Sequence, residues 1–365
     1  MPTLPKSFLH SQVRTRHWLP KRVLITRSAR AYEHGTAIAR RCEALGIEVE
    51  ELSGDQVRLG LPDDERKAYA QAKNTLAIVV APPSKLKLQP IAPSADWRVD
   101  LAQGCPAHCN YCYLAGSLKG PPITRAYANL DEIFAVLPDY LGRGTITSLN
   151  DARVAEGTTY EASCYTDPLG IETVTGSLSA AIEWFGAWDA NAQLRFTTKF
   201  ADVEPLLGLE HNGRTRMRAS INPKAFARFE GGTASVEDRL SALREMALAK
   251  YPLGLTIAPI IAAEGWQNAY TGLLEAAAMR LNDIADLDLT IELITHRFTE
   301  GSKAVLESWY PGSRLDMSDA NRSVKRNKFG GRKTVYDKDT MEKLRKFFYN
   351  RIAEDLPAAR ILYWT

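Results

Sequence analysis

Three of the five cysteines of this chain lie within a span of eight residues. They are Cys105, Cys109 and Cys112, in the stretch GCPAHCNYCYLAG that covers residues 104–116. Five cysteines with this uneven distribution are too few for a disulfide framework in a chain of 365 residues. The group of thiols therefore predicts metal or redox chemistry.

Two kinds of metal site could use these thiols. A structural zinc ion needs four protein ligands, and this stretch offers three thiolates, since His108 adjoins Cys109 and is badly placed to reach the same ion. A [4Fe-4S] cluster has four irons that each take one outside ligand, and cysteine thiolates suit them. Three cysteines would leave one iron open. We favour the iron–sulfur cluster and keep zinc as the alternative.

The elements that must position these thiols alternate between strands and helices. Apolar runs bounded by turn residues predict six strands, at 97–103, 160–166, 194–200, 215–222, 254–261 and 289–298. Helical spacing predicts helices at 130–141, 177–188, 236–250 and 266–281. Such alternation implies parallel strands with right-handed crossovers. The predicted fold is α/β, a partial (β/α)6 TIM-like barrel.

Polar side chains gather at the ends of the predicted strands. A barrel carries its chemistry at the C-terminal ends of its strands, so these side chains should meet at one mouth. They are Cys105, Cys164, Thr166, Lys199, Ser220, Asn222, His296 and Arg297. Each has an ordinary explanation when taken alone: Lys199 could be a surface lysine and Cys164 a small buried hydrophobe. Their joint placement predicts an enzyme.

Two further segments flank the predicted barrel. Residues 1–95 alternate between short strands and a helix and end in a Pro-rich connector, which predicts an N-terminal α/β extension. We place the barrel at 96–310 and a C-terminal substrate-binding hairpin and helix at 311–365.

The C-terminal segment contains a basic run. Between residues 321 and 336 six basic residues occur with no acidic one, interleaved with Phe329 and Tyr336. The run fits either a solvated loop or a phosphate-binding hairpin that turns at Gly330-Gly331.

The cysteine spacing resembles a known signature. C-x3-C-x2-C with Tyr111 before the last cysteine, directly after the first barrel strand, resembles the radical S-adenosylmethionine superfamily. Longer stretches narrow this resemblance, because CPAHCNYCYLAG, YEASCYTDPLGIE, HNGRTRMRASIN and the closing ARILYWT look like the spore photoproduct lyase family. The resemblance extends from about residue 18 to the C-terminus.

The resemblance implies a DNA-repair lyase that reverts the spore photoproduct, 5-thyminyl-5,6-dihydrothymine, to two thymines. Its cofactors would be a [4Fe-4S] cluster on Cys105, Cys109 and Cys112 and S-adenosylmethionine, which together yield a 5′-deoxyadenosyl radical. The radical would remove a hydrogen atom from the dihydrothymine ring, after which the bridge between the bases breaks.

Roles for individual residues follow from the same resemblance. Cys164 matches the family's hydrogen-atom donor, and Tyr111 and Tyr113 match a relay that returns the oxidation to the cofactor. Simple packing around the cluster is the alternative for both tyrosines. By matched position the residues that would contact S-adenosylmethionine are Tyr111, Thr166, Lys199, Ser220 and Ala258.

By the same resemblance, the basic hairpin corresponds to an element of the family that would lie as a wedge beside the lesion. Its substrate-binding residues would be Lys325, Lys328, Arg332 and Tyr336, with the cations on phosphates and the aromatic ring supporting an extruded dinucleotide.

Two features of the chain depart from the family pattern. Lys328 stands where the family has arginine, and lysine lacks the planar fork of the guanidinium group. The connection at 142–159 is longer than usual, and we expect both changes on the substrate side. The altered hairpin motivates a second hypothesis, a radical enzyme acting on a different nucleobase lesion or substrate. The cysteine cluster and the basic hairpin motivate a third, a zinc-bearing nucleic-acid-binding module.

Composition bounds the setting of this chemistry. No run of about eighteen apolar residues occurs and the N-terminus lacks an apolar signal core, so we expect a cytoplasmic protein without a membrane segment. The expected partners are DNA carrying a thymine photolesion and an electron donor such as a flavodoxin or ferredoxin. We expect a monomer.

Overall fold

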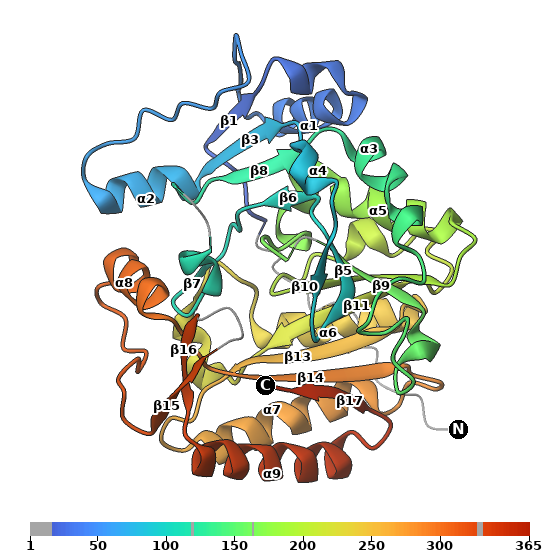
Figure 1. Ribbon diagram of the computed structural model, residues 1–365, viewed down its shortest axis with the longest axis vertical. Coiled ribbons are helices and arrows are strands. Elements are labelled where there is room, and N and C mark those ends of the chain that lie inside the picture. The colour runs from blue at the N-terminus through green and yellow to red at the C-terminus, as the bar shows by residue number, and fades with distance from the viewer. Residues whose placement is uncertain (1–16, 118–119, 163, 327–330) are drawn as a thin grey trace, which may run out of the picture.

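The computed structural model describes residues 17–117, 120–162, 164–326 and 331–365. Within these ranges the chain forms a large curled sheet and a smaller sheet, with helices around them and a separate C-terminal hairpin (Figure 1). No helix in the described ranges is long and apolar enough to cross a membrane.

The larger sheet is the predicted partial barrel. Its order is β4-β5-β9-β10-β11-β13-β14-β17, and all neighbours from β5 to β17 are parallel, whereas β4 is antiparallel to β5. The strands are β4 (Gln89–Ile91), β5 (Ala95–Val99), β9 (Thr158–Ala162), β10 (Ala192–Thr198), β11 (Thr215–Ile221), β13 (Leu253–Ile260), β14 (Leu289–Thr295) and β17 (Arg360–Trp364). The six predicted strands are confirmed, and β17 extends the sheet by a parallel strand that was not predicted.

Helices connect successive barrel strands. They are α5 (Ser177–Ala187), α6 (Val236–Leu248) and α7 (Trp266–Leu281), as predicted, and α9 (Lys338–Asp355) packs beside α7. The helix predicted at 130–141 is wrong in its second half. The α-helix there, α3 (Leu130–Ala135), is shorter, and a 3-10 turn at Leu137–Tyr140 follows it. Pro138 has no N–H group to donate to a longer α-helix.

The barrel interior contains an ion-paired network. All seven residues of β11 are buried, including Arg218, which is 2% exposed. Its guanidinium group pairs with Glu161 of β9 and Glu292 of β14. A buried charge is tolerated when it is paired, so this network ties the two halves of the sheet across the interior.

The smaller sheet has the order β2-β1-β3-β8-β6. Its strands are β2 (Val49–Glu51), β1 (Arg22–Ile25), β3 (Thr75–Val79), β8 (Thr124–Tyr127) and β6 (Ala102–Gln103), packed with α1 (Glu33–Ala44) and α2 (Glu65–Lys73). β6 and β8 lie on either side of the cysteine stretch in the sequence. The division at residue 95 stays a prediction, and this sheet includes strands from both sides of it.

The remaining elements lie outside the two large sheets. β7 (His108–Cys109) pairs with β12 (Glu230–Gly231), and the hairpin strands are β15 (Arg322–Arg326) and β16 (Arg332–Tyr336), while α4 (Glu172–Thr175) and α8 (Glu300–Trp309) complete the described helices. A bridge between Phe298 and Thr334 attaches the hairpin just beyond the C-terminal end of β14.

The connection at 142–159 does not lie where it was expected. It leads into β9, so it lies at the N-terminal ends of the parallel strands, where the Asp96 carboxylate of β5 accepts the backbone N–H groups of Ile146 and Thr147 at 2.8 Å. The cysteines follow the opposite end of β5. The prediction that this connection borders the substrate side is therefore wrong.

Candidate active site

The three predicted cluster ligands lie on one loop between β6 and β8. Cys105, Cys109 and Cys112 are free thiols, with Cys109 buried and the other two partly buried. Gly104, directly before them, has a φ of +90°, and a Cβ there would lie 2.0 Å from the carbonyl oxygen of Ile123. Only glycine therefore permits the turn into the loop.

Helix α2 of the N-terminal extension contacts this loop. The side chain of Lys73, which is 6% exposed, donates to the carbonyl oxygens of Cys105 and Ala107. One turn earlier, the Tyr69 hydroxyl is hydrogen-bonded to Nδ1 of His108 at 3.0 Å. The extension thus holds the backbone and a side chain of the cysteine loop.

The donor set suits an iron–sulfur cluster. Burial raises the pKa of Cys105 and Cys109 to about 12, and the charge of Lys73 opposes the rise at Cys105. Such thiols keep their protons at neutral pH until a metal displaces them. Within the described ranges no three His, Cys, Asp or Glu side chains are gathered closely enough to hold a single metal ion.

Lys199 is the centre of a second group of site residues. Its ammonium group donates to the Ser220 hydroxyl at 2.9 Å, to the Glu230 carboxylate at 2.9 Å and to the Ala258 carbonyl oxygen at 3.2 Å. The Tyr111 hydroxyl also donates to Glu230. The structure thus brings together four of the five predicted cofactor-contact residues.

Glu230 is a site residue that the sequence reasoning missed. Burial alone would raise the pKa of its carboxyl group, but the charges of Lys199 and Arg239 outweigh burial and hold that pKa well below its usual range. Arg239 lies 2.7 Å from the carboxylate. No sequence pattern marks Glu230, because it belongs to the two-residue strand β12 and follows no predicted strand.

Thr166, the fifth predicted contact, lies beside a second missed carboxylate. Its hydroxyl oxygen is buried and has no hydrogen-bond partner within the described ranges. The neighbouring Asp167 accepts the Lys199 backbone N–H at 2.7 Å and the Thr198 hydroxyl at 2.7 Å. A polar ligand bound at this turn would give the Thr166 hydroxyl the hydrogen bond that it lacks.

Cys164 and Tyr113 lie together at the same mouth. The Tyr113 hydroxyl donates to the carbonyl oxygen of Cys164, and the Tyr165 carbonyl oxygen accepts the Gly104 N–H at 2.9 Å. Burial, with the charge of Asp100 as a second cause, raises the pKa of the Cys164 thiol to about 12. This thiol keeps its S–H bond at neutral pH.

The hairpin carries the predicted substrate-binding residues. Lys325 and Arg332 are exposed on its two strands, whereas Lys328 lies outside the described residues. Tyr336 is 7% exposed, its hydroxyl accepts the Ala262 N–H at 2.9 Å, and its ring lies under the Arg322 guanidinium group. The structure places Tyr336 at the base of the hairpin.

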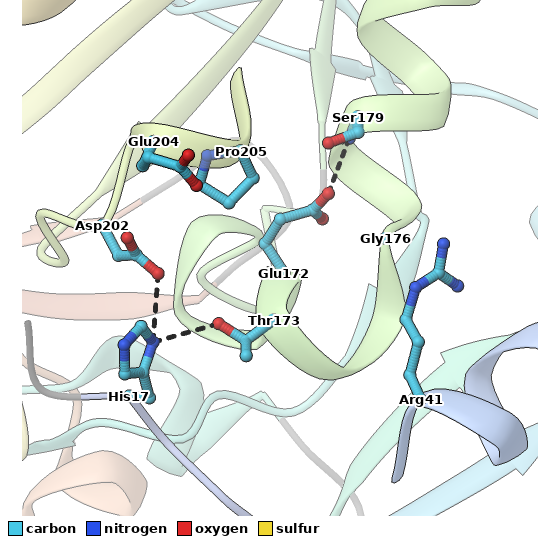
Figure 2. Close-up of a pocket in the computed structure, with 9 residues that line it drawn as sticks. All are labelled: His17, Arg41, Glu172, Thr173, Gly176, Ser179, Asp202, Glu204 and Pro205. Atoms are coloured by element: carbon cyan, nitrogen blue, oxygen red, sulfur yellow. Dashed lines mark hydrogen bonds and ion pairs between the residues drawn. The ribbon is translucent and has the colours of Figure 1, made fainter. Parts of the chain in front are cut away.

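A cavity elsewhere in the molecule involves other residues. Figure 2 shows His17 beside Thr173 and Asp202, and Arg41 and Glu172 also line this cavity. The His17 ring nitrogen Nδ1 lies 3.2 Å from the Thr173 hydroxyl and 3.0 Å from the Asp202 carboxylate. The lining of the cavity contains none of the predicted site residues. The candidate active site is therefore the mouth that holds the thiols and Lys199.

Comparisons with known proteins agree with this geometry. The family model of spore photoproduct lyase matches residues 18–365. The chain is 39% identical over 351 residues to the spore photoproduct lyase of a Geobacillus species and 37% identical over 350 residues to that of Bacillus subtilis. Each alignment covers 95% of this chain and 99% of the relative. This chain belongs to the spore photoproduct lyase family.

A solved structure of the spore photoproduct lyase family shows the same architecture. It is a double mutant of spore photoproduct lyase with bound AdoMet and dinucleoside spore photoproduct, 38% identical to this chain, with a TM-score of 0.86 and coverage of 95% of this chain and 99% of that one. This likeness confirms the predicted fold class. Membership of the family decides against the zinc-bearing nucleic-acid-binding module.

Proposed function

We propose that this member of the spore photoproduct lyase family is a DNA-repair enzyme that reverts the spore photoproduct to two thymines. One observation carries the proposal: the free thiols of the cysteine loop, the Lys199 group and Cys164 meet at the mouth of one barrel. The match to the family from residue 18 to the last residue supports it.

The residues present fit two cofactors. We propose that Cys105, Cys109 and Cys112 hold a [4Fe-4S] cluster, and that S-adenosylmethionine lies against the residues around Lys199, as bound AdoMet in a relative supports. Bound together, these groups supply an organic radical that can abstract a hydrogen atom. Lys199 offers an ammonium group to a carboxylate, and Thr166 offers its unpartnered hydroxyl.

In the proposed reaction Cys164 donates a hydrogen atom to the thymine radical left after the bridge between the bases breaks. The raised pKa of its thiol keeps the hydrogen in place at neutral pH. We propose that Tyr113, hydrogen-bonded to the Cys164 carbonyl oxygen, then gives a hydrogen atom to the Cys164 sulfur and restores the thiol. Tyr111 would give a hydrogen atom to Tyr113 and regain one from 5′-deoxyadenosine, and its bond to Glu230 fixes its hydroxyl group near Lys199.

For DNA we propose that Lys325, Lys328 and Arg332 hold phosphates while the lesion is extruded toward the mouth. The buried position of Tyr336 supports a role in fixing the hairpin against the barrel. We further propose a flavodoxin or ferredoxin as the one-electron donor and a cytoplasmic monomer as the working form.

The deciding experiment is anaerobic. The protein is reconstituted with iron and sulfide, reduced, and mixed with S-adenosylmethionine and an oligonucleotide that contains the spore photoproduct; 5′-deoxyadenosine and restored thymines are then followed by chromatography. Restored thymines are expected. Formation of 5′-deoxyadenosine without repair would favour the second hypothesis, a radical enzyme for a different nucleobase lesion or substrate.

A further inference from the structure

Lys73 is a buried cation without a carboxylate partner. Its side chain is 6% exposed, and its hydrogen bonds go to the carbonyl oxygens of Cys105 and Ala107. Within the described ranges no Asp or Glu oxygen forms an ion pair with it. Two other cations of the site differ, because the partly buried Lys199 and the buried Arg239 both pair with Glu230.

A buried ammonium group needs a compensating negative charge. Moving an isolated ion from water into a protein interior costs on the order of several kcal/mol, even after the surroundings relax. Carbonyl dipoles satisfy its N–H groups but carry no net charge. The dipole of α2 places at most about half of a negative charge at the C-terminal end of this helix. Among the described residues, the groups beside Lys73 that would carry negative charge are the thiols of the cysteine loop, which become thiolates when they bind a metal.

Lys73 lies directly against the cysteine loop, because its ammonium group donates to the carbonyl oxygens of the ligand residue Cys105 and of Ala107. Helix α2 aims the side chain there, since Tyr69, four residues earlier on the same face, is hydrogen-bonded to His108 of the loop. Two side chains of α2, a helix of the N-terminal extension, therefore contact the cysteine loop.

We propose that Lys73 is a positioning residue for the iron–sulfur cluster: its fixed positive charge compensates the anionic cluster, raises the reduction potential of the cluster and ties the loop to α2. This inference rests on the proposed function in one respect, that Cys105, Cys109 and Cys112 carry the cluster. It assigns to the N-terminal extension an electrostatic part in the reduction step.

The test compares Lys73→Met, Lys73→Gln and Lys73→Arg with the wild-type protein, all reconstituted at full length. The reduction potential is measured by redox titration followed by electron paramagnetic resonance, without S-adenosylmethionine or DNA, and iron content is measured alongside. The matched control is Lys67→Met, because Lys67 is an exposed lysine on the same helix.

Loss of the charge should destabilise the reduced, more negative cluster. At a fixed potential we expect the ratio of reduced to oxidised cluster to fall about tenfold in Lys73→Met, equal to about 59 mV for a one-electron couple. Lys73→Arg should restore most of the ratio, and Lys67→Met should leave it unchanged. Lys73→Gln keeps a hydrogen-bond donor without charge, so it tests the charge if the methionine variant takes up no iron.

The outcomes separate this inference from the proposed function. An unchanged potential in Lys73→Gln or Lys73→Met at full iron content would overturn the role of Lys73, even in a protein that repairs DNA. A lowered potential rescued by Lys73→Arg would support it, even in a protein that restores no thymines. A wild-type protein that binds no iron–sulfur cluster would overturn both.

Discussion

Glu230 couples the predicted cofactor-contact residues to one another. Its buried carboxylate accepts the Tyr111 hydroxyl and pairs with Lys199 and Arg239. Removing this charge leaves the buried Arg239 and the partly buried Lys199 without their carboxylate, so Glu230→Gln should lower the free energy of unfolding by about 3–5 kcal/mol. It should also weaken the binding of S-adenosylmethionine; urea unfolding and equilibrium dialysis measure the two effects.

The control for Glu230→Gln is Glu275→Gln. Glu275 forms an exposed pair with Arg351 at 3.3 Å, and such surface pairs contribute about 0–1 kcal/mol. Equal losses of stability in the two variants would contradict the central role given to Glu230.

Cys164 provides the sharpest residue-level prediction about product. Cys164→Ala should still cleave S-adenosylmethionine and open the lesion, but the thymine radical should give abnormal products because the S–H donor is missing. The products are separated by chromatography after a reaction in which the exchangeable thiol hydrogens of the protein have been replaced by deuterium. Cys42→Ala, which removes a buried thiol from α1, should leave the product normal; restored thymines from Cys164→Ala would remove Cys164 from the donor role.

At the scale of elements, the connection before β9 stabilises the end of the barrel at which the parallel strands begin; we call it the brace. Glu156 within it pairs with Arg153 and Arg195, and although burial opposes ionisation, these arginines lower the pKa of Glu156 to about 2. Because the folded pKa lies below the unfolded value of about 4.3, the stabilisation is present at neutral pH and is lost as pH falls through that interval.

Glu156→Gln tests the brace. We expect the variant to unfold about 2–3 kcal/mol more easily at neutral pH, with the difference from wild type shrinking by more than half between about pH 5 and about pH 3. Denaturant unfolding at several pH values measures it. The control is Glu354→Gln, because Glu354 is exposed and pairs with Arg351 on α9; its difference in unfolding free energy from wild type should not shrink as pH falls. A difference that stays constant with pH for Glu156→Gln would refute the brace.

The hairpin should contribute through phosphate contacts. The double variant Lys325→Gln with Arg332→Gln should bind lesion-bearing DNA more weakly, and the slope of log affinity against log salt should fall by about 1–2 in magnitude. Fluorescence anisotropy at several salt concentrations measures the slope. The matched control changes Lys21 and Arg40, exposed cations of the N-terminal extension; an equal change in slope there would argue against the hairpin.

The elements that could be predicted from the sequence are those with a local signature. The barrel strands and the helices between them have clear periodicity, and parallel strands bring their C-terminal ends together, so Cys164, Lys199 and Ser220 were expected at one mouth. The strands β6, β8 and β17 were not predicted as separate strands, because their short runs carry no clear alternation and their partners are distant in sequence. Lys73 was missed for a related reason, since its partner loop belongs to another segment.

At the scale of the whole molecule, the cysteine loop joins the two sheets. It leaves from β6 and returns through β8, both in the smaller sheet, while β7 within it pairs with β12 beside the barrel mouth. Lys73 adds a contact from α2. The geometry of the candidate site therefore depends on both sheets being folded at once.

This arrangement predicts that the two sheets unfold as one cooperative unit. Opening the smaller sheet would expose β8 and release the loop, so the slowest amides of β1, β3 and β8 should exchange with the same free energy as those of β10 and β11. Native-state hydrogen exchange followed by mass spectrometry measures both sets in one sample. A smaller sheet that opens at a clearly lower free energy, while the barrel stays protected, would show instead that the N-terminal extension is a separately folding unit whose hold on the loop is lost without unfolding the barrel.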